Sequence, residues 1–256
     1  MKYILGAVLV LFTMLHANSG EEIFEKKCVN CHQYYIPQSQ IIANAKNGNR
    51  DLNLSAPTLT EISFMLKGQV GDRTDDAEGQ KLQIEEFLTD YLDTPTKDKG
   101  VIPDEFTKFF EPMPSMKGQL NEDEIEILTD FIYEYAEKMT IEHSVKRHTY
   151  EEAVKIAKAE GKIILIEGFI PYCRGCIKMD REVMVDARVK NTLEKDFVFV
   201  KKNLLIETLP LGMKRLGTPS FYFIDAKKNK VIDMLQGTGT VDEFLEMLES
   251  IKKSGS

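Results

Sequence analysis

Two pairs of cysteines, each spaced as C-x-x-C, are the residues of this sequence best suited to chemistry. Cys28 and Cys31 lie in KKCVNCHQYY, where His32 follows directly, whereas Cys173 and Cys176 lie in FIPYCRGCIKM and no histidine follows them. A disulfide within either pair would close a very small loop and would remove little conformational entropy from the unfolded chain. Both pairs therefore indicate chemical rather than structural roles.

The first pair has the sequence of a haem-attachment site. In C-x-x-C-H the two thiols bond covalently to the haem, and the adjacent histidine becomes an axial ligand of the iron. A zinc site would need two further ligands, and beyond the first 17 residues the other histidines are only His143 and His148. We therefore predict one covalent haem c held by Cys28, Cys31 and His32.

The iron of such a haem takes a second axial ligand opposite the histidine. Methionine fills this position in many electron-transfer cytochromes and raises the reduction potential. Met113 is the candidate, because a proline on each side restricts the loop that would present its sulfur. Met116 in the same segment, His143 and His148 are the alternatives.

The second pair has the context of a redox-active dithiol. It follows a predicted buried strand at 162–169 and begins a predicted helix. The helix N-terminus and the adjacent Arg174 both favour the thiolate form of Cys173. Cys176, one turn later, is placed to resolve a mixed disulfide. We predict an exchangeable dithiol with Cys173 as the nucleophile, and an inert structural disulfide is the alternative.

A further signal, LGTPSFYFID, follows the second pair along the chain. Pro219 stands directly before a predicted strand at 220–226. A cis peptide bond at this proline would bring the backbone of Thr218 beside the dithiol, where it could hydrogen-bond an extended substrate. A trans proline at the start of a strand is the alternative.

The elements that must position these residues differ between the two halves of the chain. Up to residue 138 the pattern is helical, with predicted helices at 21–32 and 122–139, the second capped by Asn121. Helices and strands alternate after residue 148, which is the order of an α/β fold. The predicted helices there are 149–161, 176–182, 186–195 and 240–253, and the predicted strands are 162–169, 197–203, 220–226 and 229–235. The domains expected from this pattern are an all-α domain at 18–138, a linker at 139–148 and an α/β domain at 149–256.

The first residues have the pattern of a secretory signal peptide. Lys2 supplies a positive charge, an apolar run extends from Tyr3 to Leu15, and Ala17 completes a cleavage site. The run is shorter than the about 20 residues of a membrane span, and an uncleaved anchor is the alternative. We expect cleavage after Ala17, export to the periplasm and no stable membrane span in the mature protein.

Residues 20–138 resemble class I c-type cytochromes. The matched segments are GEEIFEKKCVNCH, APTL, and MPSM followed by an acidic amphipathic helix. The resemblance implies that the carbonyl of Pro57 accepts a hydrogen bond from His32, although the glycine that usually precedes this proline is Ala56 here. It also makes Met113 the distal ligand.

Residues 145–252 resemble the thioredoxin family, and in particular the periplasmic thioredoxin-like domains of transmembrane disulfide reductases. The matched segments include KIILIEGFIPYCRGC and GTPSFYFID, with Tyr172 in place of the usual tryptophan before the first cysteine. The resemblance implies a thioredoxin fold and places the family's buried acid on Glu167. Glu167 would then move protons to and from Cys176, whereas a surface position at the strand end is the alternative reading.

These signals together predict an exported thiol–disulfide oxidoreductase that carries one haem c. Its expected partners are protein disulfides or dithiols and a periplasmic redox protein, and a formal net charge of -8 excludes nucleic acid. A dithiol couple at roughly −120 to −270 mV lies below a His/Met haem, so electrons exchanged between the sites would run from the dithiol to the haem. The alternative is an electron-transfer cytochrome whose thioredoxin-like half only binds a partner.

Overall fold

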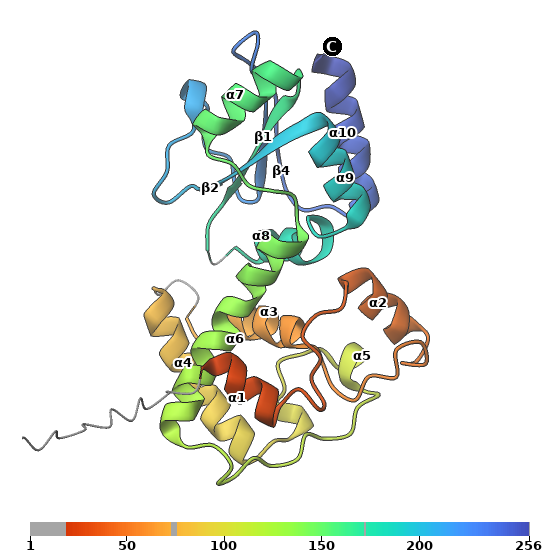
Figure 1. Ribbon diagram of the computed structural model, residues 1–256, viewed down its shortest axis with the longest axis vertical. Helices are drawn as coiled ribbons and strands as arrows, with labels where there is room; N and C mark the ends of the chain where they lie inside the picture. The colour runs from red at the N-terminus through yellow and green to blue at the C-terminus, as the bar shows by residue number, and fades with distance from the viewer. Residues whose placement is uncertain (1–18, 73–75, 172, 256) are drawn as a thin grey trace, which may run out of the picture.

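The structure, a computed structural model, describes residues 19–72, 76–171 and 173–255. The predicted signal peptide at 1–17 and its cleavage site lie outside the described residues. A helical N-terminal domain is joined to a C-terminal domain with a central sheet (Figure 1). Within the three described ranges, no helix is both long enough and apolar enough to span a bilayer.

The N-terminal domain is built from helices that pack around its last and longest helix. Three of these helices begin with a capping box, at Ser19, Thr58 and the predicted cap Asn121. The helices are α1 (Gly20–Lys27), α2 (Gln38–Lys46), α3 (Leu59–Gln69), α4 (Ala77–Asp93), η1 (Lys97–Lys99), α5 (Asp104–Thr107) and α6 (Glu122–His143). Helices α1, α3 and α4 each pack against α6 and bury a common apolar core.

The helix predicted at 21–32 ends earlier in the structure. Helix α1 stops at Lys27, and Cys28 forms its C-cap. The backbone amides of Cys28 and Val29 both donate to the carbonyl of Phe24, at 2.8 and 3.0 Å, which tightens and closes the last turn. The C-x-x-C-H motif therefore lies in a turn, where the amide of His32 donates to the carbonyl of Cys28 at 2.9 Å.

Helices α1 and α6 approach each other closely at Gly20. A Cβ added at this glycine would lie 2.6 Å from the carbonyl oxygen of Ile127 and would overlap the side chain of Phe131. Only glycine allows this contact, because both obstacles belong to α6 and neither is the flexible end of a long side chain.

We expect Gly20→Ala to lower the free energy of unfolding of the N-terminal domain by about 1–3 kcal/mol, because the added methyl group forces the two helices apart. Thermal unfolding followed by helical circular dichroism measures the change. Gly68→Ala is the matched control, since an added Cβ there meets no atom within 4 Å. An equal loss of stability in both variants would contradict the packing argument.

The C-terminal domain has the α/β order that the sequence predicts. Its four strands form one sheet in the order β2-β1-β3-β4, with β1 parallel to β2 and antiparallel to β3, and with β3 antiparallel to β4. The elements are α7 (Tyr150–Glu160), β1 (Ile163–Phe169), α8 (Arg174–Lys178), the π-helical η2 (Met179–Val183), α9 (Ala187–Asp196), β2 (Phe197–Asn203), η3 (Pro210–Gly212), β3 (Ser220–Asp225), β4 (Lys230–Gln236) and α10 (Val241–Gly255). The described strands all follow residue 162, as predicted.

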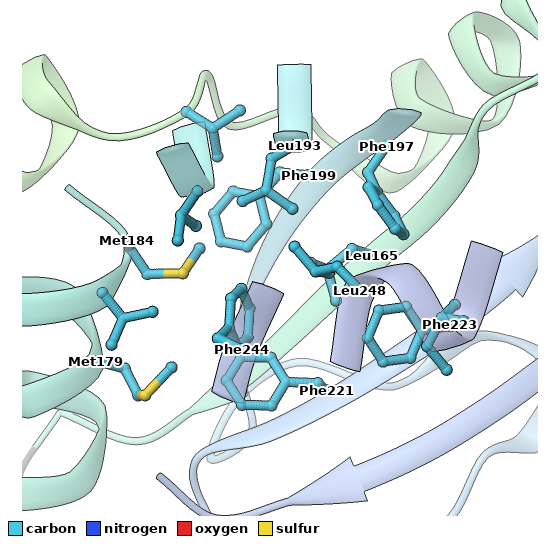
Figure 2. Packing of buried hydrophobic residues seen from close by; sticks show 14 residues of the cluster. Leu165, Met179, Met184, Leu193, Phe197, Phe199, Phe221, Phe223, Phe244 and Leu248 are labelled. Carbon is cyan, nitrogen blue, oxygen red and sulfur yellow. The ribbon is translucent and has the colours of Figure 1, made fainter. Parts of the chain in front are cut away.

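Alternation along the strands assigns each side chain to one face of this sheet. Ile164 and Ile166 of β1 pack with the core under α7, whereas Leu165 between them packs with the core under η2, α9 and α10. Figure 2 shows this second core, to which Leu165 and its cross-strand partners Phe199 and Phe223 belong. The face of Leu165 is also the face of the residue two positions later, Glu167.

The segment predicted as a linker, 139–148, is structured. Helix α6 continues to His143, and Met139 is buried in the N-terminal core. Val145 is buried in the C-terminal core, and Arg147 forms a parallel bridge with Phe199 at the free edge of β2. Buried residues of this segment therefore belong to the cores of both domains, although Ile141 and Lys146 are exposed. Helix α3 also packs against α8, and α2 against η2.

Candidate functional site

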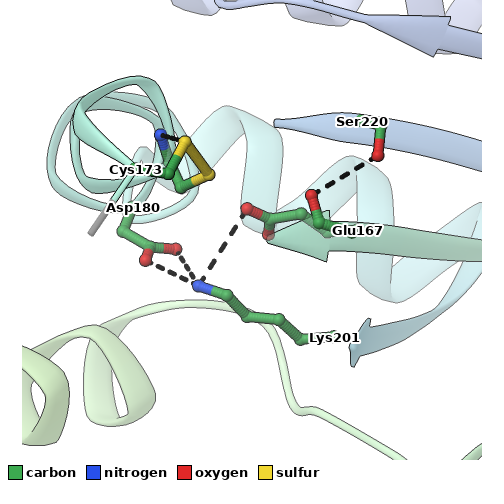
Figure 3. The surroundings of a disulfide bond; sticks show 7 residues. Glu167, Cys173, Asp180, Lys201 and Ser220 are labelled. Carbon is green, nitrogen blue, oxygen red and sulfur yellow. Dashed lines mark hydrogen bonds and ion pairs between the residues drawn. A yellow bond between two sulfur atoms is a disulfide. The ribbon is translucent and has the colours of Figure 1, made fainter. Parts of the chain in front are cut away.

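Cys173 and Cys176 form a disulfide at the start of α8 (Figure 3). Cys173 is the N-cap of this helix, and its Sγ accepts a hydrogen bond from the backbone amide of Cys176 at 3.1 Å. An amide donor at this position also stabilises the thiolate that reduction would leave on Cys173. Both cysteines are buried, with 8% and 3% of their surface exposed.

The peptide bond between Thr218 and Pro219 is cis, as the sequence suggested. The Pro219 ring lies against the C-x-x-C loop, because a Cβ added at Gly175 would be 2.9 Å from its Cδ and 2.9 Å from Cγ2 of Thr238. The small residue inside the C-x-x-C sequence therefore lets the proline loop reach the disulfide. This contact brings the Thr218–Pro219 segment next to the dithiol site.

Glu167 is fully buried near the end of β1, so it is not a surface residue at a strand end. Neither carboxylate oxygen accepts a hydrogen bond from the described residues. Burial raises the pKa of Glu167 to about 7, an effect that the charge of Lys201 partly opposes. A carboxyl group that is partly protonated at neutral pH is suited to exchange protons with a neighbouring thiol.

Lys201 and Asp180 complete the surroundings of Glu167, and the sequence predictions did not include them. Lys201 is the partner of Glu167 in the β1–β2 register, with Nζ 4.0 Å from Oε1. The same Nζ lies 2.6 Å from both carboxylate oxygens of Asp180 on η2. Figure 3 shows this group beneath the disulfide. The alternation of side chains along β2 could have identified Lys201, because this lysine lies on the same buried face as Phe197 and Phe199.

The C-x-x-C-H motif, for which the sequence predicts a haem, lies in the turn after α1. Cys28 is partly buried, Cys31 is exposed, and neither belongs to a disulfide. His32 Nδ1 lies 2.8 Å from the carbonyl oxygen of Pro57. Because a carbonyl only accepts hydrogen bonds, Nδ1 carries the proton, and the lone pair of Nε2 is left for an iron.

Electrostatics at the motif disfavour thiol–disulfide exchange at Cys28. Burial, assisted by Cys31, raises the pKa of Cys28 to about 11, so this thiol holds its proton at neutral pH and is a weak nucleophile. Burial also lowers the pKa of His32, although its hydrogen bond to Pro57 opposes the shift. A neutral imidazole is the form that binds a metal.

A mainly apolar pocket lies beside Pro57, on the side of the domain formed by α2, α5 and the loop after α5. Its aromatic wall includes Phe109 and Phe110. Apolar and aromatic walls beside Pro57, whose carbonyl oxygen contacts His32, would suit one face of a macrocycle. The other lining residues are Ile41, Asn44, Ala45, Asn49, Leu54, Glu61, Ile102 and Phe106. The residues present therefore fit a haem.

The four candidates for the distal ligand lie in different places. Met113 and Met116 are partly buried and pack against the core of the N-terminal domain. The ring of His143, at the end of α6, stacks on Tyr35 with centroids 3.8 Å apart. The backbone of His148 donates to β2 at Phe199 O, so this histidine belongs to the C-terminal domain. The two methionines share the domain of the haem motif.

Helix α3 connects the two cysteine sites through the structure. It begins one residue after Thr58, next to the Pro57 carbonyl that holds His32, and it packs against α8. Burial raises the pKa of Glu61 in its first turn, and the charge of Arg181 on η2 partly opposes this shift. Hydrogen bonds with the backbone and the side chain of Thr58 oppose the same shift more strongly than Arg181 does.

Residues 145–226 match the family described as Thioredoxin-like. A protein of Aquifex aeolicus (strain VF5), described as uncharacterized, is 26% identical over 167 residues and is aligned over 62% of this chain and 95% of its own length. Two solved structures are also similar. A thioredoxin from Thermus thermophilus is 26% identical, with a TM-score of 0.39 and coverage of 44% of this chain and 91% of that chain. The C-terminal domain of DsbD from Neisseria meningitidis in the reduced form is 17% identical, with a TM-score of 0.31 and coverage of 39% and 91%.

Proposed function

We propose that this protein, whose C-terminal domain is thioredoxin-like, is an exported thiol–disulfide oxidoreductase with a covalent haem c in its N-terminal domain. One observation carries the proposal: Cys173 and Cys176 form a disulfide at a helix start, and the buried carboxyl group of Glu167 lies in its surroundings (Figure 3). That arrangement provides both a reversible two-electron centre and a proton acceptor for it.

The reaction begins when the Cys173 thiolate attacks a disulfide of the substrate protein. A mixed disulfide forms, and one sulfur of the substrate leaves as a thiolate. Cys176 then gives its proton to the Glu167 carboxylate, and its sulfur attacks the sulfur of Cys173. The Cys173–Cys176 disulfide forms, and the second substrate sulfur leaves and takes up a proton. Two electrons have passed from the dithiol to the substrate.

The residues of the N-terminal domain that would hold the haem are Cys28, Cys31, His32 and Met113. A haem bound there supplies a one-electron redox centre. Pro57 orients the imidazole of His32 by accepting its Nδ1 proton at 2.8 Å, and this fixes the tautomer that leaves Nε2 free for the iron. The aromatic wall at Phe109 and Phe110 limits the access of water to the site.

The experiment that tests this function mixes the reduced, haem-containing protein with a model protein disulfide and follows substrate thiols with time. We expect substrate reduction, with a rate of mixed-disulfide resolution that rises as the pH passes about 7, because Glu167 accepts a proton only in its ionised form. Absorbance of the haem in the same samples records its oxidation state. No substrate reduction at any pH would reject the oxidoreductase and would favour the cytochrome with a partner-binding domain.

A further inference from the structure

Charged side chains from both domains meet at the junction below the dithiol. The group contains both basic and acidic side chains, and most of its members are partly or fully buried. We call the group the junction cluster, and it consists of Lys67, Glu137, Arg147, Glu167, Asp180 and Lys201. Lys67 and Glu137 belong to helices of the N-terminal domain, so the surroundings of Glu167 are not made by the thioredoxin-like domain alone.

Arg147 is the member that connects the two domains. Its bridge to Phe199 aligns it with β2, so its side chain lies on the same face of the sheet as Phe199 and Lys201. Its Nη1 donates to Glu137 Oε1 of α6 at 2.6 Å. Its Nε is buried and donates to no partner among the described residues. The guanidinium is therefore held between α6 and the buried acid by one strong hydrogen bond.

The charges that act most strongly on Glu167 come from β2, η2, the segment after α6, and α6 itself. Burial raises the pKa of Glu167, and the charge of Lys201 lowers it. The next charges in order of size are those of Asp180, which raises this pKa, Arg147, which lowers it, and Glu137, which raises it. Burial lowers the pKa of Lys67 on α3, and the charge of Glu137 and, more weakly, that of Asp180 oppose this shift. Glu137 and Arg147 therefore act on the buried acid with opposite signs, from outside the sheet that carries it.

The pair itself is more strongly bound than its exposure suggests. Burial alone would raise the pKa of Glu137, but the hydrogen bond and charge of Arg147 lower it below its ordinary value. The Glu137 side chain is 51% exposed and that of Arg147 is 23% exposed. Solvent screens the first charge more than the second, so the influence of Glu137 on Glu167 is modest.

We propose that Glu137 and Arg147 are positioning residues for proton transfer at the dithiol, through which the helical domain takes part in setting the protonation of Glu167. Glu137 fixes the guanidinium at the junction, and the two charges together determine how readily Glu167 accepts the proton of Cys176. The kinetic consequence rests on the proposed function, whereas the effect on Glu167 is a property of the folded chain.

The test is a pH titration of the Glu167 side-chain carboxyl by ¹³C NMR in the full-length, haem-containing protein, with the resonance assigned by its loss in Glu167→Gln. We expect Glu137→Gln to move the midpoint down by roughly half a pH unit, because loss of a negative charge favours the ionised acid. Arg147→Gln is expected to move it up by a similar amount. The double variant is expected to return close to wild type, since two opposite charges are removed together.

Glu134→Gln is the matched control, because Glu134 lies on the same helix and contacts Lys81 instead of Arg147. Its midpoint is expected to equal that of wild type. Shifts in the same direction for Glu137→Gln and Arg147→Gln, or no shift in either, would overturn the proposal, because a purely structural contact predicts no opposition of sign. If the wild type fails to reduce disulfides, the proposed function fails, but this titration still decides the role of the pair.

Discussion

Cys173→Ser is expected to lower the rate of protein disulfide reduction by roughly a thousandfold, to the level of uncatalysed exchange. A serine hydroxyl stays protonated at neutral pH and does not attack a disulfide sulfur. The amide of Cys176, which points at Sγ of Cys173 at 3.1 Å, would then stabilise no thiolate. The measurement is the initial rate of thiol release from a model protein disulfide, with a chemical reductant regenerating the dithiol.

Cys176→Ser distinguishes attack from resolution. Cys173 keeps its position as the N-cap of α8 in this variant, so attack continues, but no second thiol displaces the substrate. We expect a mixed disulfide to accumulate, visible as a substrate adduct by mass spectrometry. Wild-type turnover in Cys173→Ser, or an adduct on a residue other than Cys173, would contradict the assignment of the nucleophile.

The second large effect concerns the haem. In a host that attaches haem to C-x-x-C-H sequences, the wild type is expected to keep its haem after denaturation in acid, because thioether bonds survive unfolding. The double variant Cys28→Ser, Cys31→Ser is expected to lose all of it, since hydroxyls form no such bonds. Mass spectrometry of the denatured chains measures the difference.

Cys173→Ser, Cys176→Ser is the matched control for the haem, because it removes the other C-x-x-C pair and leaves the N-terminal thiols unchanged. It is expected to retain one haem per chain. A wild-type chain that matures without bound haem would reject the cytochrome assignment and leave the dithiol assignment standing. Comparison of Met113→Leu with Met116→Leu then identifies the distal ligand, because loss of a methionine ligand lowers the reduction potential.

Local sequence patterns determined a large part of this protein. The capping residues Asn121 and Thr149 and the left-handed C-cap at Gly161 were readable because each acts on residues within one turn of itself. The strand at β1 and the hairpin of β3 and β4 followed from alternation and turn residues. The cis bond before Pro219 was proposed from a single proline at the start of a strand, and the structure has it.

Other local features depended on competition between neighbouring elements. The end of α1 was placed too late, because the choice between one more helical turn and the turn at Cys28 is made by bonds to Phe24 that periodicity does not show. The end of the helix predicted at 122–139 was placed too early, because α6 continues to His143, and Met139 is buried in the N-terminal core. Both differences arise because tertiary packing outweighs intrinsic preference at the ends of elements.

The sequence by itself indicated which residues could carry the chemistry: a thiol pair followed by a histidine, for which we propose a haem, and a thiol pair at a helix start, which the structure joins in a disulfide. Only the tertiary structure decided which charges surround Glu167. These charges belong to four separate parts of the chain: Lys201 lies on β2, Asp180 on η2, Arg147 on the connecting segment and Glu137 on α6. Only the register of the sheet and the docking of the two domains bring them together. Spacing along the chain reports on contacts within a few residues, whereas the electrostatics of a buried acid depend on distances through space.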